Sequence, residues 1–428
     1  MNGSELDSVE KLLDDSIVYI NQRNPQKAGE LLERVLEIRT KEFGEDALSV
    51  GLTFYYIGNV LRMEERFDEA LEKLNRALAI LMKESGENHA YIVNTYELLG
   101  RVFLQQGNYE KAEEMCRKVV DLQGGFHAQE SNLMDLSQNL ALSLQMQGKF
   151  SEAIKIQKVV LVKLLQIHGE DHPDVVLVYI AIAGLLKGQK RLDDAHQMLD
   201  KSIEICYRLQ ELGDDFDTVN LVRALRTKAG LLEEQGNMEG STEMLHKVTM
   251  VQKESLGEMH PSTAEAYEKL AVAYAKREMQ EDGINALNKA LEFRQTVLGE
   301  DHPDTKKVVG FLIMLNREKI AKALRLQGLA LNAKGDSAMA IRLFHEALDV
   351  YKEIYTAHPK MATVYESIAT VKVEQGLLED GIAASAEALK IRRKMQGDDD
   401  TDTKGRMEAH RSLLKRLLEN RNEMRELR

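Results

Sequence analysis

The chain has 428 residues, with 57 Lys and Arg against 70 Asp and Glu, and a net charge of −13 at neutral pH. This acidic balance argues against a nucleic-acid-binding protein and against attachment to an anionic membrane surface. Hydrophobic residues make up 43% and charged residues 30%, and no run reaches the roughly 18 apolar residues of a membrane helix. The composition therefore predicts a folded chain without membrane insertion.

Proline and cysteine usage narrow the class further. The chain contains five Pro residues, a residue that interrupts helices, so a nearly all-helical fold is expected. Cys116 and Cys206 form neither a metal-binding spacing nor a disulfide framework, which favours a reducing compartment. The first residues lack the features of a signal or transit peptide. We expect a cytoplasmic protein, with the mitochondrion or plastid as the alternative if a targeting segment has been removed.

A small residue recurs at one register along the chain, at intervals of 41 to 46 residues and one interval of 57. The recurring positions are Ala28, Ala70, Ala112, Ala153, Ala195, Ser241, Gly283, Ala340 and Gly381. Twelve residues before each of them stands a second small residue: Ser16, Gly58, Gly100, Ala141, Ala183, Ala229, Ala271, Gly328 and Ala369. Small side chains allow two helix backbones to approach closely, so the pattern predicts a series of helical hairpins.

The turns and linkers follow the same period. Gly107 and Gly148 are placed to end a first helix in the left-handed conformation. Lys190 and Glu278 replace this glycine in two later turns, which we therefore expect to close differently. The linkers between hairpins contain Gly-Glu-x-His-Pro at residues 169–173, 257–261 and 299–303, with Pro suited to the first turn of the next helix.

These hairpins resemble tetratricopeptide repeats, and their length and linker resemble the repeats of the kinesin light chain family. The resemblance covers residues 8–395 and implies a right-handed α-solenoid of about nine repeats of about 42 residues. The heptad coiled coil that precedes the repeats of true kinesin light chains is not present here. The resemblance implies a non-enzymatic scaffold or adaptor that binds a partner protein in its concave groove, with a link to the cytoskeleton.

Two segments depart from the repeat. The long interval holds about 15 extra residues around positions 304–316, read as either an additional helix or a lengthened first helix. After residue 395 we expect an acidic loop at 396–403 and a capping helix at 404–428, because the last repeat of a solenoid needs a cover for its apolar face.

The residues offer little support for catalysis. His172, His260, His302 and His358 recur in successive linkers, where a hydrogen bond near a helix start is favoured over a metal site. Phosphate-binding loops and nucleophile elbows are absent from the sequence. We predict no enzymatic activity, no cofactor and no metal.

Polar residues expected on the inner face of the first helices are the candidate partner-binding site, because such side chains can hydrogen-bond a peptide backbone or pair with charges. They are Tyr55, Asn59, Arg62, Asn94, Arg101, Gln138, Asn139, Arg223, Arg226, Lys269, Lys322, Arg325 and Asn332.

The basic residues of this set support two interpretations. Arg223, Arg226, Lys322 and Arg325 suggest a clamp for an acidic peptide in an acidic protein. Alternatively, these residues and Lys228 form ion pairs between helices, with carboxylates such as Glu233, Glu265 and Glu268 as partners. Two other functions also remain open, an organellar assembly or regulatory factor and a self-associating structural protein.

Overall fold

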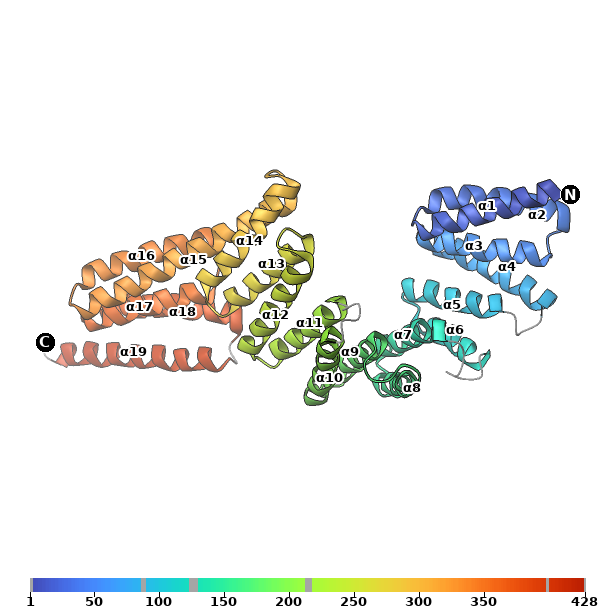
Figure 1. The fold of residues 1–428 in the computed structure, drawn as a ribbon. Coiled ribbons are helices and arrows are strands. Elements are labelled where there is room, and N and C mark those ends of the chain that lie inside the picture. Colours follow the sequence, from blue (N-terminus) through green and yellow to red (C-terminus); the bar gives the residue numbers. More distant parts are fainter. Residues whose placement is uncertain (1–2, 86–89, 123–129, 212–217, 398–399, 427–428) are drawn as a thin grey trace. The chain divides into compact units, whose positions relative to one another are not determined.

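The computed structural model describes residues 3–85, 90–122, 130–211, 218–397 and 400–426. These residues form helices and, within the described ranges, no strand (Figure 1). The chain divides into two compact units, Met1–Leu231 and Leu232–Arg428. The all-α solenoid class predicted from the sequence is confirmed. No described helix combines the length and the apolar character needed to cross a bilayer.

The helices follow the predicted hairpin order, with odd-numbered helices up to α17 as the first members. The first unit contains α1 (Gly3–Asn21), α2 (Pro25–Phe43), α3 (Leu48–Met63), α4 (Phe67–Ser85), α5 (Ala90–Gln105), α6 (Tyr109–Leu122), α7 (Glu130–Met146), α8 (Phe150–His168), α9 (Pro173–Gly188) and α10 (Leu192–Glu211). Helix α11 (Thr218–Glu234) contains the boundary between the units. The second unit continues with α12 (Met238–Leu256), α13 (Pro261–Lys276), α14 (Gln280–Leu298), α15 (Pro303–Ala333), α16 (Ser337–Ile354), α17 (Pro359–Glu374), α18 (Leu378–Gln396) and α19 (Thr401–Glu426).

The recurring small residues lie where two helices of a hairpin meet. Ala70 in α4 is completely buried, and a Cβ atom added to Gly58 in α3 would lie 2.5 Å from Cγ of Leu74. In the second unit, a Cβ atom added to Gly328 would lie 2.6 Å from Cε1 of Phe344. Contacts this short leave no room for a side chain, which explains why the register accepts small residues.

The turns at Lys190 and Glu278 close in the same way as the glycine turns, so the expectation that they differ was wrong. Lys190 has φ 59° and Glu278 has φ 57°, both in the left-handed region, as has Gly107 with φ 76°. The amide of Arg191 donates to the carbonyl of Leu186 at 3.0 Å, which is the six-residue closure that also ends helices before glycine. The hairpin geometry therefore imposes the conformation, at an energetic cost for a residue with a Cβ atom.

The four linker histidines cap the helices that follow them. Nδ1 of His172, His260, His302 and His358 accepts a hydrogen bond of 3.2 Å from the amide two residues later, and Pro occupies the first helical position each time. The interpretation of these histidines as hydrogen-bonding residues at helix starts is confirmed.

The extra residues around 304–316 lengthen a first helix and do not form a separate one. Helix α15 has 31 residues, and Glu318 within it is almost completely buried. Its carboxylate accepts hydrogen bonds from the Tyr355 hydroxyl and, at 2.7 Å, from Lys360. The lengthened helix is thereby joined to the start of α17.

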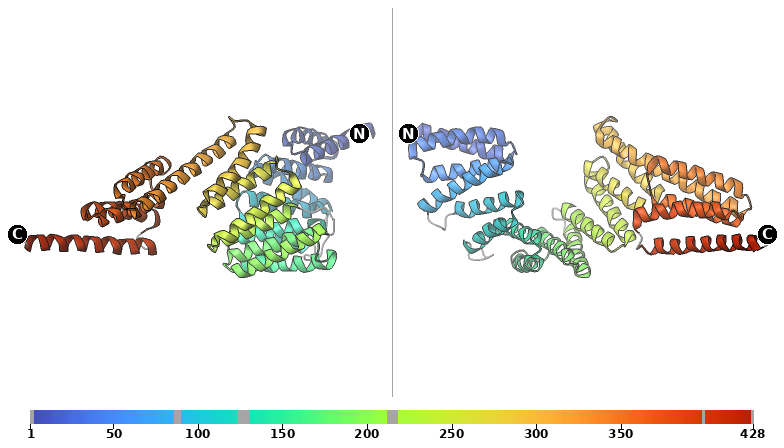
Figure 2. Two further views of the ribbon diagram at one scale, coloured as in Figure 1. Left: turned by 60° about the vertical axis from the view of Figure 1, so that its left-hand side comes forward. Right: turned by 180° about the vertical axis from the view of Figure 1, so that it is seen from behind.

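The terminal helices begin earlier than expected. Helix α1 starts at Gly3, ahead of residue 8. Helix α19 starts at Thr401, inside the predicted 396–403 loop, because Oδ2 of Asp400 accepts hydrogen bonds from the amide and hydroxyl of Thr403 at 3.0 and 3.2 Å. Figures 1 and 2 show α19 alongside α18, which it contacts.

The junction before α19 repeats the one before α15. Arg392 in α18 donates to Glu366 at 2.8 Å and to Asp402 at 2.5 Å. Arg294 in α14 lies within 2.9 Å of Glu268 and 3.6 Å of Asp304. The arginine in both cases joins the first helix of its own hairpin to the next first helix, so α19 docks as another first helix would.

Candidate protein-binding surface

Consecutive first helices contact one another in both units. The pairs are α3 with α5, α5 with α7 and α7 with α9 in the first unit, and α15 with α17 in the second. We call the surface that these odd-numbered helices present away from their hairpin partners the first-helix wall. All thirteen candidate residues lie on first helices, and their surroundings differ along the wall.

A cluster of tyrosines occupies the wall where α3 meets α5. The ring centroid of Tyr55 lies 5.2 Å from that of Tyr56 and 5.6 Å from that of Tyr91, in edge-to-face geometry. The hydroxyl groups of Tyr56 and Tyr91 are 3.1 Å apart. Burial, followed by the neighbouring Tyr91 and Glu97, raises the pKa of Tyr55. The cluster offers aromatic surface with hydroxyl groups.

Arg62 lies half-buried next to this cluster. Its guanidinium donates to Oδ1 of Asn59 at 3.0 and 3.3 Å and to Oε1 of Gln105 at 3.4 Å, and among the described residues it forms no ion pair. Burial and then the charge of Arg101 lower its pKa. A half-buried cation bonded to neutral amides retains the capacity to bind a carboxylate.

The other candidates on α5 and α7 extend this surface. Arg101 forms an exposed ion pair with Asp135 at 2.7 Å, which links the two helices. Asn94 and Asn139 are half-buried and Gln138 is exposed. The structure therefore brings Tyr55, Asn59, Arg62 and Arg101 into one neighbourhood, with the amides of α7 on the adjacent first helix.

The basic residues of α11 belong to the first unit. Arg223 is exposed and Arg226 is half-buried. Lys228 forms an ion pair with Asp200 of α10. Pairing of Lys228 with a carboxylate agrees with the ion-pair interpretation, although Asp200 was not among the partners suggested from the sequence.

The basic residues of the second unit are engaged to different degrees. Lys269 pairs with Glu265 at 2.6 Å, and Lys322 pairs with Glu278 at 3.3 Å. Arg325 donates to the hydroxyl of Ser367 at 3.1 Å, and Asn332 donates to Glu374 at 2.8 Å.

Of the suggested carboxylates, Glu233 pairs with Lys276 and Glu268 with Arg294. Arg223 and Arg226 on one side and Lys322 and Arg325 on the other belong to different structural units.

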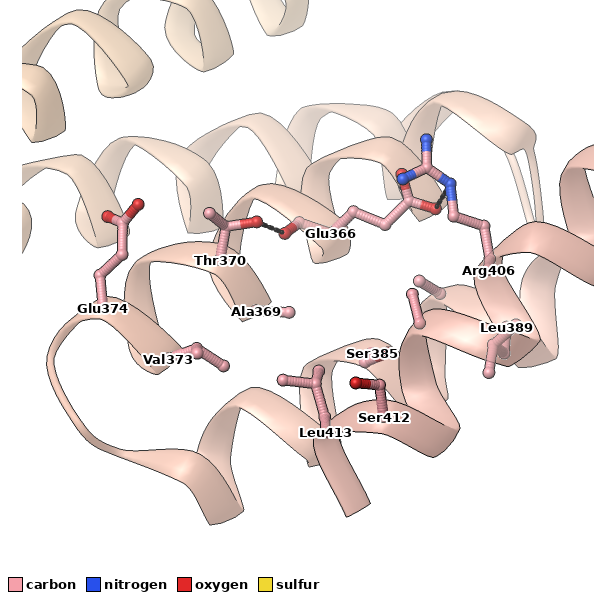
Figure 3. Close-up of a pocket in the computed structure, with 12 residues that line it drawn as sticks. Glu366, Ala369, Thr370, Val373, Glu374, Ser385, Leu389, Arg406, Ser412 and Leu413 are labelled. Atoms are coloured by element: carbon pink, nitrogen blue, oxygen red, sulfur yellow. Dashed lines mark hydrogen bonds and ion pairs between the residues drawn. The ribbon is translucent and has the colours of Figure 1, made fainter. Parts of the chain in front are cut away.

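Two hollows in the second unit were not predicted. The first, of about 370 Å³, lies between α17, α18 and α19. Figure 3 shows Glu366 and Arg406 at one end of it and Leu413 beside Ser412. Small residues of all three helices, such as Ala369, line it, so α19 does not fill the space. The second, of about 270 Å³, is lined by residues of α13, α14 and α15, among them Val272, Phe311 and Lys269.

The family follows from the sequence matches. One family model, described as "Tetratricopeptide repeat", matches residues 16–83, 49–123, 133–208 and 319–402. A second model with the same description matches residues 263–304. These regions cover well over half of the chain, which therefore belongs to the tetratricopeptide repeat family. Proteins of this family generally mediate protein–protein interactions, and the fold is typically non-enzymatic.

The chain is also similar to individual proteins and solved structures. The chain is 23% identical over 279 residues to Protein KINESIN LIGHT CHAIN-RELATED 3 of Arabidopsis thaliana, a match that spans 63% of this chain and 39% of that protein. Kinesin light chain TPR-like repeats from Podospora anserina match at 20% identity, covering 48% of this chain and 97% of that one, with a TM-score of 0.44. A tetratricopeptide repeat protein from Parabacteroides merdae matches at 15% identity, covering 72% and 99%, with a TM-score of 0.44.

Proposed function

We propose that this chain is a non-enzymatic scaffold that holds a segment of a partner protein on the first-helix wall of its first unit. The observation that carries the proposal is Arg62, a half-buried guanidinium whose hydrogen bonds go to the neutral side chains of Asn59 and Gln105. A carboxylate of the partner replaces these weak contacts with a charge-assisted hydrogen bond. The aromatic surface of Tyr55 packs against the apolar part of the same segment.

The expected partner segment is therefore acidic. Arg62 and Arg101 place two cations on neighbouring first helices, and the carboxylate of Asp135 occupies Arg101 until a ligand competes for it. Half-buried Asn94 and Asn139 supply amide groups that can bond an extended peptide backbone. A cytoskeletal partner is suggested by the kinesin light chain resemblance.

Selection from a random peptide display library tests this proposal and does not require the partner to be identified first. The selected peptides are expected to carry Asp, Glu or a free carboxyl terminus. Arg62→Gln should weaken their binding at least tenfold, because a hydrogen bond to a charged group contributes about 1.5–3 kcal/mol. Raising the salt concentration should weaken it as well.

Arg66→Gln is the matched control. Arg66 belongs to the same hairpin but is exposed and bound to Glu69 at 2.5 Å and Glu64 at 3.2 Å. Its loss should leave peptide affinity unchanged. Peptides that bind Arg62→Gln as tightly as the unmodified chain would refute a site at Arg62.

A second location for the same function is supported by Arg325. Its guanidinium donates to the hydroxyl of Ser367, a neutral partner, while neighbouring Lys322 is bound to Glu278. In this alternative, Arg325→Gln abolishes peptide binding and Arg62→Gln does not. The clamp of Arg223 and Arg226 is tested in parallel by reversing both charges to Glu.

The remaining alternatives are separated by simple measurements. Sedimentation equilibrium over a hundredfold range of concentration tests self-association, since a self-associating scaffold gains mass as concentration rises. Fluorescent tagging of the native full-length protein distinguishes the proposed cytoplasmic location from the mitochondrion or plastid.

A further inference from the structure

The linker between α8 and α9 gathers three metal-ligating side chains. His168 is the last residue of α8, His172 caps α9, and Asp174 is the second residue of α9. One ligand atom from each of the three lies within 4.8 Å of the other two. The two imidazole rings stack with centroids 4.0 Å apart. Among the residues that the structure describes, no other group of three His, Cys, Asp or Glu side chains comes together in this way.

We propose that His168, His172 and Asp174 bind a divalent first-row transition metal ion, with zinc as the expected ion. Imidazole nitrogens and a carboxylate oxygen are ligands that zinc accepts in tetrahedral geometry. Nδ1 of His172 lies 3.9 Å from Oδ2 of Asp174. Bonds of about 2.1 Å to a tetrahedral zinc ion place two ligand atoms about 3.4 Å apart. The carboxylate thus needs to move by about half an ångström.

The three residues leave room for a fourth ligand. His168 is exposed and His172 and Asp174 are half-buried, so water can complete the coordination. The exposed ring of His168 is free to turn out of the stack and direct a nitrogen at the ion. Glu170 and Asp171 add negative charge to the same linker, although Arg208 pairs with both, at 3.3 and 2.8 Å.

Metal binding competes with the helix cap for one lone pair. Nδ1 of His172 now accepts the amide hydrogen of Asp174 at 3.2 Å. A metal ion on this nitrogen displaces that hydrogen bond, and the affinity is correspondingly moderate.

A second linker in the chain separates the structural role of these residues from the proposed one. Residues 299–304 have the same sequence as residues 169–174, Gly-Glu-Asp-His-Pro-Asp. There, His302 caps α15 with an identical 3.2 Å hydrogen bond, and its Nδ1 lies 3.8 Å from Asp304. The preceding residue is Leu298, where the first linker has His168. Capping therefore accounts for His172. Both linkers carry the aspartate, whereas only the first linker has a histidine before the shared sequence.

Calorimetric titration of the untagged full chain with zinc chloride at pH 7.5 tests the proposal. One saturable site of micromolar affinity is expected, at least tenfold weaker in His168→Leu, the residue found in the matched linker. Leu298→His should add a second equivalent of zinc by completing the ligand set at the other linker. Both positions are exposed, so these variants should melt near the unmodified chain.

Cobalt(II) supplies an independent readout, because ligation by imidazole and carboxylate changes its visible absorption. The band should appear with the unmodified chain and disappear in His168→Leu. Zinc affinity and cobalt spectra that are unchanged in His168→Leu would overturn the proposal, and so would the absence of any saturable zinc binding.

Discussion

Lys360, at the start of α17, donates a hydrogen bond of 2.7 Å to Oε2 of Glu318 in the lengthened helix α15. The side chain of Glu318 is 4% exposed and that of Lys360 is 22% exposed. The pair joins the lengthened helix α15 to the first helix of the next repeat. The Tyr355 hydroxyl completes the surroundings of the carboxylate, and burial followed by Glu318 raises the pKa of Tyr355.

Removing this buried charge should destabilise the second unit. We expect Glu318→Gln to lower the free energy of unfolding by about 3 kcal/mol, because Lys360 is left without its carboxylate in a mostly buried position. Urea denaturation and hydrogen exchange of α17 amides measure the loss. Glu353→Gln is the control, since its ion pair with Arg317 is exposed and should contribute less than about 1 kcal/mol. Equal effects of the two variants would contradict the inferred role of burial.

The cap formed by His358 should make stability fall in mild acid. Burial, and then the charge of Lys360, lowers the pKa of His358 below its ordinary value of 6.5. Above pH 6.5 the His358 ring is neutral in both the folded and the unfolded chain, and its contribution to the free energy of unfolding is fully present. As the pH falls below 6.5, the unfolded chain binds this proton first and stability declines.

His358→Asn isolates this effect, because Asn can cap the helix and does not titrate. The melting temperature of the variant should fall less than that of the unmodified chain between pH 8 and pH 5. Superimposable pH profiles would show that His358 does not contribute to the acid sensitivity.

Glycine should be better than lysine at position 190. Lys190 is exposed and adopts φ 59°, a conformation that costs a residue with a Cβ atom roughly 1–2 kcal/mol. Lys190→Gly removes this strain and is expected to raise the free energy of unfolding by about 1 kcal/mol. Glycine also gives the unfolded chain more conformational entropy, which offsets part of the gain. Gly148→Ala is the converse test, because Gly148 has φ 75° and open space around its Cβ position. The melting temperature measured by calorimetry should rise in Lys190→Gly and fall in Gly148→Ala.

Arg392 should control the docking of α19. Its side chain is 7% exposed and bridges Glu366 and Asp402. Arg392→Met is expected to accelerate hydrogen exchange in the first turns of α19 at least tenfold, because docking loses its buried ion pairs. Arg406→Met should have a smaller effect, since Arg406 is 48% exposed and lies 3.4 and 3.5 Å from the same two carboxylates. A larger effect of Arg406→Met would assign the docking to the exposed pair.

Short-range requirements for helix packing and helix capping determined the hairpin fold, and they can be seen directly in the sequence. Small residues at Gly58 and Ala70 specify close approach within one hairpin, and the His-Pro linkers specify capped helix starts. Both are short-range requirements, so they recur at a fixed spacing and reveal the repeat. The register also assigns each residue of a first helix to a face, so candidate residues for the first-helix wall could be proposed from the sequence.

Tertiary structure decided how the charged and polar groups are used. Arg62 bonds to neutral amides of α3 and α5, whereas Lys228 reaches Asp200 on another helix, and no local pattern distinguishes these two outcomes. The left-handed turn at Lys190 also depends on the hairpin, because the packing energy of two long helices exceeds the strain of one residue. His168 and His172 stack because α8 ends and α9 begins at the same linker. Long-range packing sets such distances, and it depends on many residues that are remote in the sequence.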